Sequence, residues 1–261
     1  MTHKKDWRIP WRCAVLVSLY VLAVPAEASA GIGNRPLSTD EATILDHGEW
    51  SVATGWSFVR QPNNQNEWTW ATDLEYGLGG LLEASVELPY QIIDQTTASN
   101  LDGWGDVALR LEVNPVKEHG RAPAVSLAAQ LKTHSANEDR GLGIGKVDYT
   151  MTALASKTFG KTSFHVNVGM TVVGDPPGTD QSDSVSYNFA VEHALTEQLM
   201  LAAEVYGQTN TDRDAETHPW ETLAGLVYQF AEHLAVDLGI GMGLSQASPD
   251  LRLASGVTLT F

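Results

Sequence analysis

Apolar side chains occupy every second position through most of this chain, and the clearest run covers residues 234–244. A period of two predicts β-strands with one apolar face and one polar face. In the neighbouring segments 68–78 and 82–92, the polar face carries four carboxylates: Asp73, Glu75, Glu83 and Glu87. Because an unpaired buried charge is very costly, this face cannot be a dry core and must contact water.

About twelve such segments follow one another between residues 49 and 261, each close to the roughly 10 residues that a tilted transmembrane strand needs. Polar, variable connections such as residues 134–145 follow the odd-numbered segments, and short turns such as Gly79-Gly80 follow most even-numbered ones. Long outer loops and short periplasmic turns are typical of bacterial outer-membrane barrels. The sequence therefore predicts an all-β fold, a transmembrane antiparallel β-barrel of about twelve strands, with a soluble secreted sheet protein as the alternative.

Aromatic residues gather near both ends of the predicted strands. Trp68, Trp70 and Trp220 lie near predicted outer ends, whereas Tyr228 and Phe230 lie near predicted inner ends. Two aromatic girdles are expected at the membrane interfaces of a barrel, while a soluble sandwich would place its large aromatics mid-strand. The distribution favours the barrel.

The chain ends on an apolar alternation, Val257, Leu259 and Phe261. Bacterial outer-membrane barrels commonly end on Phe in this way. We interpret these three residues as an assembly signal for the outer-membrane barrel assembly machinery.

Residues 1–30 are predicted to be a cleaved signal peptide, because a basic start and an apolar run precede Ala28-Ser29-Ala30, which has the form of a cleavage site. Cleavage removes four basic residues and two acidic ones, so a formal net charge of −16 becomes −18. A chain this acidic is not expected to bind nucleic acid. The single Cys13 would leave with the signal peptide, which excludes disulfides and thiol chemistry. Residues 31–48 are polar and without a sustained period, and we expect an extended periplasmic lead before a barrel at 49–261.

Four stretches resemble members of the outer-membrane family named for the MetA pathway of phenol degradation. They are the Arg35–Asp40 segment RPLSTD and residues 73–91, 103–113 and 234–261. They lie in order across most of the mature chain. The resemblance implies an outer-membrane channel for small compounds, with aromatic ones as candidates.

The inward face is the candidate substrate path, because it carries most of the charged side chains of the predicted strands. The predicted lumen-lining residues are Asp73, Glu75, Glu83, Glu87, Asp106, Arg110, Glu112, Lys132, Asp148, His165, Asn167, Glu192, Glu204, Glu221, Asp237 and Arg252. If they line water, they form a negative lumen that favours cations. Alternatively, they pair with one another and with amides to plug a barrel that is narrower than a porin of about sixteen strands.

A lipid-acting hydrolase is a weaker hypothesis. His165 and Asn167 share the inward face, and Ser126 or Ser186 could lie near them. Catalysis needs a nucleophile and a base in contact, which the spacing does not indicate, and His165 is predicted to point away from lipid.

An outer loop contains Asp212, Asp214, Glu216 and His218, which could bind a divalent cation through oxygen ligands. A solvated acidic loop is the preferred interpretation, and we expect no metal and no cofactor.

We therefore expect a Gram-negative outer-membrane protein that passes small solutes passively. A non-conducting structural or surface-interaction barrel is the second hypothesis. The expected partners are membrane lipid and lipopolysaccharide, the assembly machinery and small-molecule solutes.

Overall fold

The computed structural model describes residues 35–63, 65–94, 100–175, 181–212 and 215–261. The predicted signal peptide lies outside these residues. The strands are β1 (Trp50–Arg60), β2 (Asn66–Gly79), β3 (Leu82–Asp94), β4 (Leu101–Trp104), β5 (Ala108–Val116), β6 (Ala124–Lys132), β7 (Asp148–Phe159), β8 (Thr162–Val172), β9 (Ser184–Ala194), β10 (Leu199–Gln208), β11 (Trp220–Ala231), β12 (Leu234–Gly243) and β13 (Leu251–Thr260). A single 3-10 turn, η1 (Glu138–Arg140), is the one helical element of the described chain.

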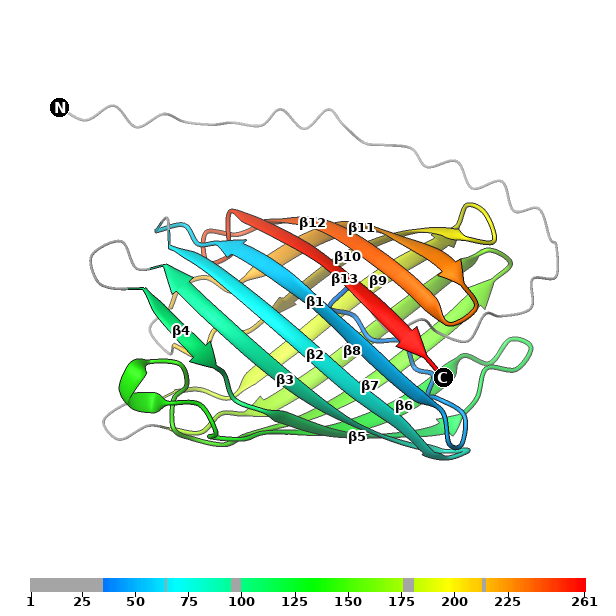
Figure 1. Ribbon diagram of the computed structural model, residues 1–261, viewed down its shortest axis with the longest axis horizontal. Helices are drawn as coiled ribbons and strands as arrows, with labels where there is room; N and C mark the ends of the chain where they lie inside the picture. The colour runs from blue at the N-terminus through cyan, green and yellow to red at the C-terminus, as the bar shows by residue number, and fades with distance from the viewer. Residues whose placement is uncertain (1–34, 64, 95–99, 176–180, 213–214) are drawn as a thin grey trace.

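The strands form one antiparallel sheet that closes on itself (Figure 1). β1 pairs with β2 on one side and with β13 on the other, so that Gly55 lies opposite both Ala71 and Gly256. The pairing continues strand by strand from β13 down to β5, then to β3, and β2–β3 closes the ring. The predicted antiparallel barrel of twelve strands is confirmed.

Thirteen strands make twelve positions in the wall because β4 and β5 share one neighbour. β3 pairs with β5 through residues 82–87 and with β4 through residues 90–93. Pro89 lies at the interruption and has no N–H to donate, although its carbonyl accepts a hydrogen bond from the Gly105 N–H at 2.9 Å. The short β4 therefore continues the line of β5.

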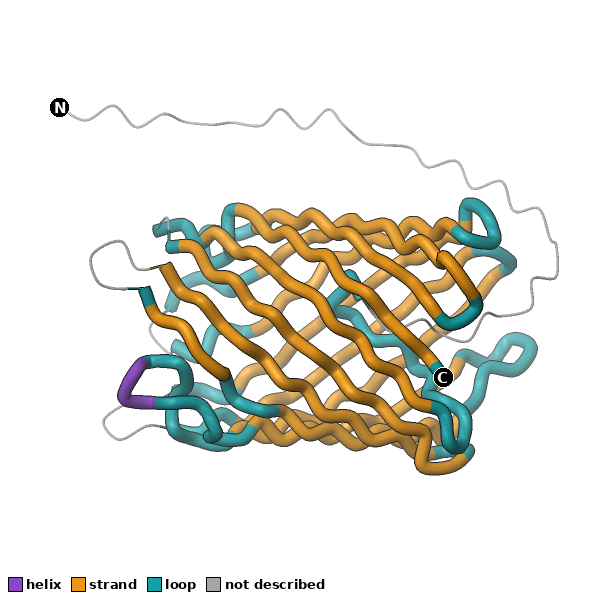
Figure 2. Tube along the Cα trace, viewed as in Figure 1, coloured by secondary structure: helices purple, strands orange, loops and turns teal. Residues whose placement is uncertain are grey.

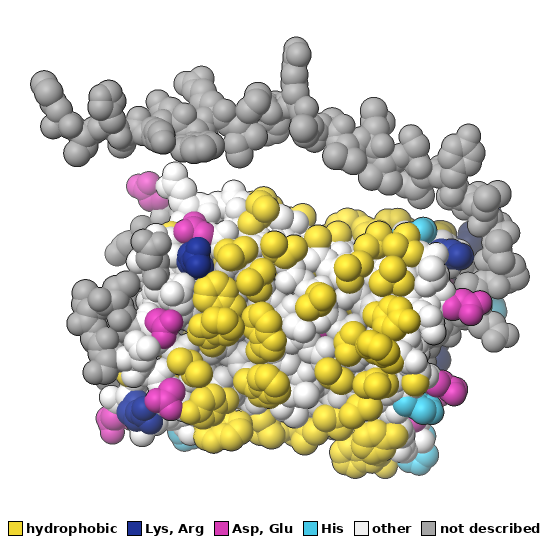
Figure 3. All heavy atoms as spheres, turned by 45° about the horizontal axis from the view of Figure 1, so that its top comes forward, with side chains coloured by type: hydrophobic (Ala, Val, Ile, Leu, Met, Phe, Trp, Pro, Cys, Tyr) yellow, Lys and Arg dark blue, Asp and Glu magenta, His cyan; other side chains and the backbone are white. Residues whose placement is uncertain are grey.

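The outer surface of the barrel is apolar. Leu238, Ile240 and Met242 on β12 are 59%, 56% and 57% exposed, as the period of two predicts. Figure 3 shows hydrophobic side chains across the middle of the barrel, with charged side chains at its two ends. This surface matches the hydrocarbon region of a bilayer. Among the described residues, no helix is long and apolar enough to cross a membrane.

The aromatic girdles occur at the ends where the sequence predicts them. Trp70 and Trp104 are largely exposed near the outer ends of their strands, and Phe159, Phe230 and Phe261 are exposed near the inner ends. Phe261 is hydrogen-bonded to the first strand, since it and Trp50 exchange two backbone hydrogen bonds of 2.8 and 2.9 Å. The barrel therefore closes up to its C-terminal residue.

The N-terminal lead (residues 31–48) differs from expectation. Its described part, from Arg35 onward, runs inside the barrel, where it appears in Figure 2 as a loop enclosed by the strands. Its backbone is hydrogen-bonded to side chains of β3, β8 and β10. For the described residues, the position in the lumen replaces the expected extended periplasmic segment; residues 31–34 lie outside the described part. The contacts of the lead depend on inward side chains that only barrel closure brings together.

Candidate functional site

The first contact of the lead is at Arg35. Its Nε lies 3.3 Å from Asp237 Oδ2, and its Nη2 donates to the Ser255 carbonyl at 3.1 Å. Gly55 and Gly256 face the guanidinium, and a Cβ atom at either position would collide with it. These inward glycines therefore make room for the arginine.

Two further glycines accommodate Pro36. A Cβ atom at Gly225 or Gly239 would meet the proline ring at or below van der Waals contact. Next to it, Leu37 packs in a buried cluster with Ala190, Ala202 and Leu223. Small residues on β9 to β12 thus shape a seat for the start of the lead.

Glu204 on β10 binds the next two residues of the lead. Its carboxylate accepts hydrogen bonds from the Ser38 N–H at 2.8 and 3.0 Å, the Thr39 N–H at 2.9 Å and the Thr39 hydroxyl at 2.7 Å. Glu204 is 3% exposed. Three donors of the lead therefore converge on one carboxylate, which attaches the lead firmly to β10.

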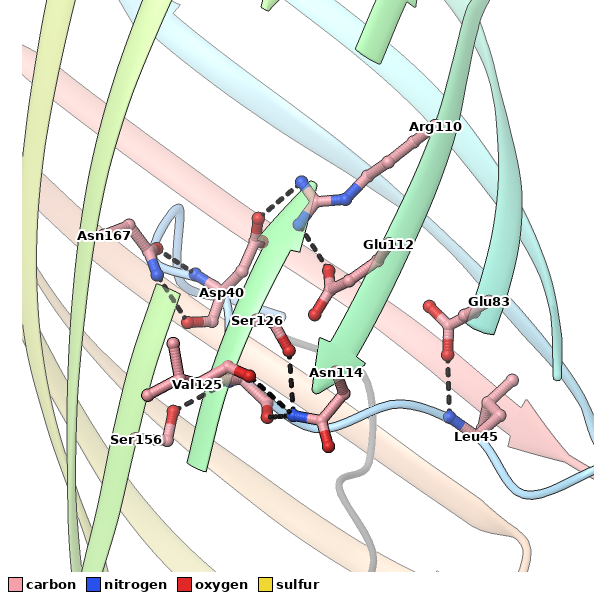
Figure 4. A network of polar contacts seen from close by, with 11 residues as sticks. Asp40, Leu45, Glu83, Arg110, Glu112, Asn114, Val125, Ser126, Ser156 and Asn167 are labelled. Atoms are coloured by element: carbon pink, nitrogen blue, oxygen red, sulfur yellow. Dashed lines mark hydrogen bonds and ion pairs between the residues drawn. The ribbon is translucent and has the colours of Figure 1, made fainter. Parts of the chain in front are cut away.

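Asp40 links the lead to the opposite side of the lumen (Figure 4). Its N–H donates to Asn167 Oδ1 at 2.6 Å, and its carbonyl accepts from Asn167 Nδ2 at 2.9 Å. Its carboxylate binds Arg110 Nη1 at 2.7 Å, while Arg110 Nη2 binds Glu112 Oε2 at 2.7 Å. Asp40 thus joins β8 to β5 across the interior.

Ala42 is fully buried and is held on both of its backbone groups. Its N–H donates to Ser156 Oγ at 2.8 Å, and its carbonyl accepts from Asn114 Nδ2 at 2.6 Å. Further along, the Leu45 N–H donates to Glu83 Oε2 at 2.7 Å. The lead is therefore bound along its length, from Arg35 to Leu45.

A cavity of about 890 Å³ remains between the lead and one side of the barrel. It extends from Glu232 and His233 in the β11–β12 turn to Gln130 on β6. Six of the predicted lumen-lining residues line it: Asp73, Glu75, Glu83, Glu87, Arg110 and Glu112. No outer-loop residue that the structure describes contributes to its lining, so the cavity is placed toward the periplasmic half.

The comparisons with known proteins agree with this architecture. Residues 34–261 match the family described as "Putative MetA-pathway of phenol degradation". The chain belongs to this family. The predicted resemblance is thereby confirmed. No curated protein matches the sequence.

Two of the solved structures that are similar to this family member illustrate the fold. One is the COG4313 outer membrane channel from Pseudomonas putida F1, with a TM-score of 0.69 and 14% identity, covering 84% of this chain and 97% of that one. The other is the NanC porin, with a TM-score of 0.57 and 12% identity, covering 80% and 98%. At these identities the likeness shows the fold, an outer-membrane barrel. The outer membrane of a Gram-negative bacterium is the location that this fold indicates.

The other predicted lumen-lining residues lie away from the cavity. Lys132 pairs with Asp148, and Asp106 accepts a hydrogen bond from the Ala136 N–H at 2.9 Å. Arg252 binds both oxygens of Glu221, at 2.9 and 3.2 Å. These charges are paired with one another or with loop backbone, so only part of the predicted set lines the cavity.

His165 does not contact Ser126 or Ser186 in the way that the hydrolase hypothesis needs. Its Nδ1 lies 2.8 Å from Ser156 Oγ, and its Nε2 lies 3.4 Å from Glu192 Oε2. Ser156 is 4% exposed, and its hydroxyl oxygen already accepts the Ala42 N–H. A nucleophile must reach its substrate, so this enclosed serine serves to hold the lead.

In the described part of the acidic outer loop, the His218 side chain binds the backbone of the loop itself. His218 Nδ1 accepts from the Asn210 N–H at 3.0 Å. Asp214 lies outside the described residues. Within the described chain, no three His, Cys, Asp or Glu side chains form a metal-binding group.

Sequence reasoning missed the residues that seat the lead, namely Gly225, Gly239, Asn114 and Ser156. The sequence feature that could have indicated them is the large number of glycines and serines on the inward face. Such small residues leave room for a segment inside the barrel.

Proposed function

We infer that this protein is an outer-membrane channel that passes small solutes passively. The observation that carries the inference is the polar cavity of about 890 Å³ inside a barrel with an apolar exterior. A lumen lined by carboxylates stays hydrated, which passage of polar solutes requires. The solved COG4313 outer membrane channel, which shares this fold, supports the same class of function.

The proposed channel prefers cations. Ten of the residues that line the cavity are Asp or Glu, against two arginines. Rings of carboxylates attract cations and exclude anions. Aromatic compounds come into consideration through the family alone, and the cavity lining favours those that carry a positive charge.

The test is the single-channel current of the refolded mature protein in a planar bilayer under a salt gradient. Discrete current steps with a reversal potential that favours cations are expected. The double variant Asp73→Asn/Glu87→Gln should show a smaller preference for cations, because eight of the ten acidic residues remain. The matched control is Glu197→Gln, which removes one exposed carboxylate from the β9–β10 turn. Silence from protein shown to be folded contradicts the proposal.

A non-conducting barrel is the second candidate, and one observation favours it. The lead is hydrogen-bonded to strands on both sides of the lumen, through Glu204, Asn167, Ser156 and Glu83. In this reading the lead is a permanent part of the interior. A variant that loosens the lead and still gives no current would support it.

Enzymatic activity is not part of the proposal, because the Ser156 hydroxyl that contacts the His165 ring is buried and also binds the lead. The partners that we propose follow from the surface. Lipid and lipopolysaccharide cover the apolar exterior, and the barrel assembly machinery binds the terminal strand with its exposed Leu259 and Phe261.

A further inference from the structure

The cavity beside the lead has the size of a small-molecule site. Its volume of about 890 Å³ falls within the roughly 300–1,000 Å³ of typical ligand pockets. Its lining mixes two kinds of side chain. Carboxylates line it from β2, β3, β5 and the lead. The small or apolar side chains come from the lead and from β1, β2 and β5: Leu37, Ile44, Ala53, Ala71 and Ala108.

Asp73 and Glu87 are the carboxylates best placed to bind a ligand. They lie directly opposite each other in the β2–β3 register, on the inward face. Both are half-buried, and neither has a hydrogen bond or an ion pair within the described part of the chain. Directly opposed like charges are unfavourable in a sheet. A bound positive charge between them would remove that cost.

Both arginines that line the cavity among the described residues already have carboxylate partners. Arg110 is held between Asp40 and Glu112, and Arg35 is held by Asp237. Glu112, which also lines the cavity, is 5% exposed, and its Oε1 accepts no hydrogen bond from any described residue. Arg110 therefore leaves one oxygen of Glu112 without a hydrogen bond. The cavity retains an excess of negative charge.

The arrangement suits an organic cation better than a metal ion. The described residues contain no group of three or more potential metal ligands, because the carboxylates are spread along two strands. An ammonium group can be satisfied by two carboxylates, and the small and apolar side chains that line the same cavity can contact a hydrocarbon or aromatic body.

We propose that the cavity binds a small protonated amine with an apolar body, its ammonium group lying between Asp73 and Glu87. This inference rests on the proposed function, since it names the class of solute that the channel takes. Binding can nevertheless be measured without conduction.

The experiment is isothermal titration calorimetry on the folded full-length mature protein in detergent micelles, with 2-phenylethylamine as the probe. Its neutral analogue 2-phenylethanol and the anion phenylacetate are titrated in parallel, and protein-free micelles correct for partitioning. The amine is expected to bind saturably, and the two analogues at least about tenfold more weakly, because each lacks the ion pair. Equal binding of amine and alcohol overturns the proposal.

Variants assign the site. Asp73→Asn/Glu87→Gln should weaken amine binding by about tenfold or more, and Glu87→Gln alone should weaken it less. Glu197→Gln, on the periplasmic turn, should leave it unchanged. Undiminished binding by the double variant overturns the proposed site, and so does the absence of saturable binding to folded wild-type protein. Competition by Ca²⁺ at micromolar concentration would identify a metal site instead and also overturns the proposal.

The two proposals fail in different ways. If the amine binds and no current is seen in bilayers, the site stands and the channel fails. If cation current is seen and the amine does not bind, the channel stands and the solute class is wrong.

Discussion

Inward-facing carboxylates have different roles on two walls of the lumen. On β10 to β13, Glu204 holds the lead, Asp237 holds Arg35, and Glu221 accepts from Arg252 and from the Tyr206 hydroxyl at 2.8 Å. On β2 and β3, Asp73 and Glu87 lie side by side on adjacent strands, and both line the cavity. Both walls show one alternation of apolar and acidic residues. An inward carboxylate that accepts hydrogen bonds from the lead or from an arginine stabilises the interior. A carboxylate without such a partner can instead interact with a solute.

The sharpest test of the anchoring wall is Glu204→Ala. It leaves two backbone N–H groups and one hydroxyl of the lead without their acceptor in a buried place, so a loss of about 3 kcal/mol in the free energy of unfolding is expected. Denaturant titration of the protein folded into lipid vesicles measures it. Glu204→Gln keeps one acceptor oxygen and should lose about half as much. A loss no greater than that of Glu197→Gln would show that the lead contributes little to stability.

A second variant introduces a larger side chain at Gly239, which packs against Pro36 of the lead. Gly239→Val places side-chain atoms where the proline ring now lies, since even a Cβ atom would approach Pro36 to 3.0 Å. Overpacking of this kind costs about 2 kcal/mol, and here the lead can relieve it by moving. A rise in single-channel conductance is therefore expected beside the loss of stability. Gly80→Ala in the β2–β3 turn, where a Cβ meets nothing within 4 Å, is the control. No current from either the wild type or this variant would favour the non-conducting barrel, and an unchanged current would show that the lead does not limit conduction.

Ser156→Ala probes a smaller anchor. It removes the acceptor of the Ala42 N–H and the partner of His165 Nδ1, and a loss of about 1 kcal/mol is expected. The same variant separates anchoring from catalysis. A structural serine affects stability and the protease sensitivity of the lead, whereas a nucleophile would affect hydrolysis of a p-nitrophenyl ester. Wild-type esterase activity that disappears in Ser156→Ala would revive the hydrolase hypothesis.

The barrel itself was predictable from the sequence, because the alternation of apolar and polar residues within one strand is enough to assign its outward and inward faces. Leu238, Ile240 and Met242 face outward without reference to any other part of the chain. Strand number and the aromatic girdles follow from the same local pattern. The interruption between β4 and β5 was not predictable, because it depends on how Pro89 meets a neighbouring strand.

The site was only half predictable. The inward position of Asp73 and Glu87 follows from alternation, but their unpaired state depends on which residues of the lead lie near them. Asp40 and Arg110 are 70 positions apart, and Thr39 and Glu204 are 165 apart. Such pairs form only once the ring is closed, and no local pattern in residues 31–48 indicates them.

The last prediction concerns the cavity wall, where a variant is expected to gain stability rather than lose it. Asp73→Asn/Glu87→Gln removes two opposed charges that have no ion pair, so the protein should gain about 0.5 kcal/mol rather than lose stability. The gain should shrink in high salt, because screening already weakens the repulsion in the wild type. Denaturant titration at low and high ionic strength measures both. The matched control on the other wall is Glu204→Gln, which must lose stability under all these conditions. If the cavity variant also loses stability, Asp73 and Glu87 are anchors like Glu204, and the two walls do not differ.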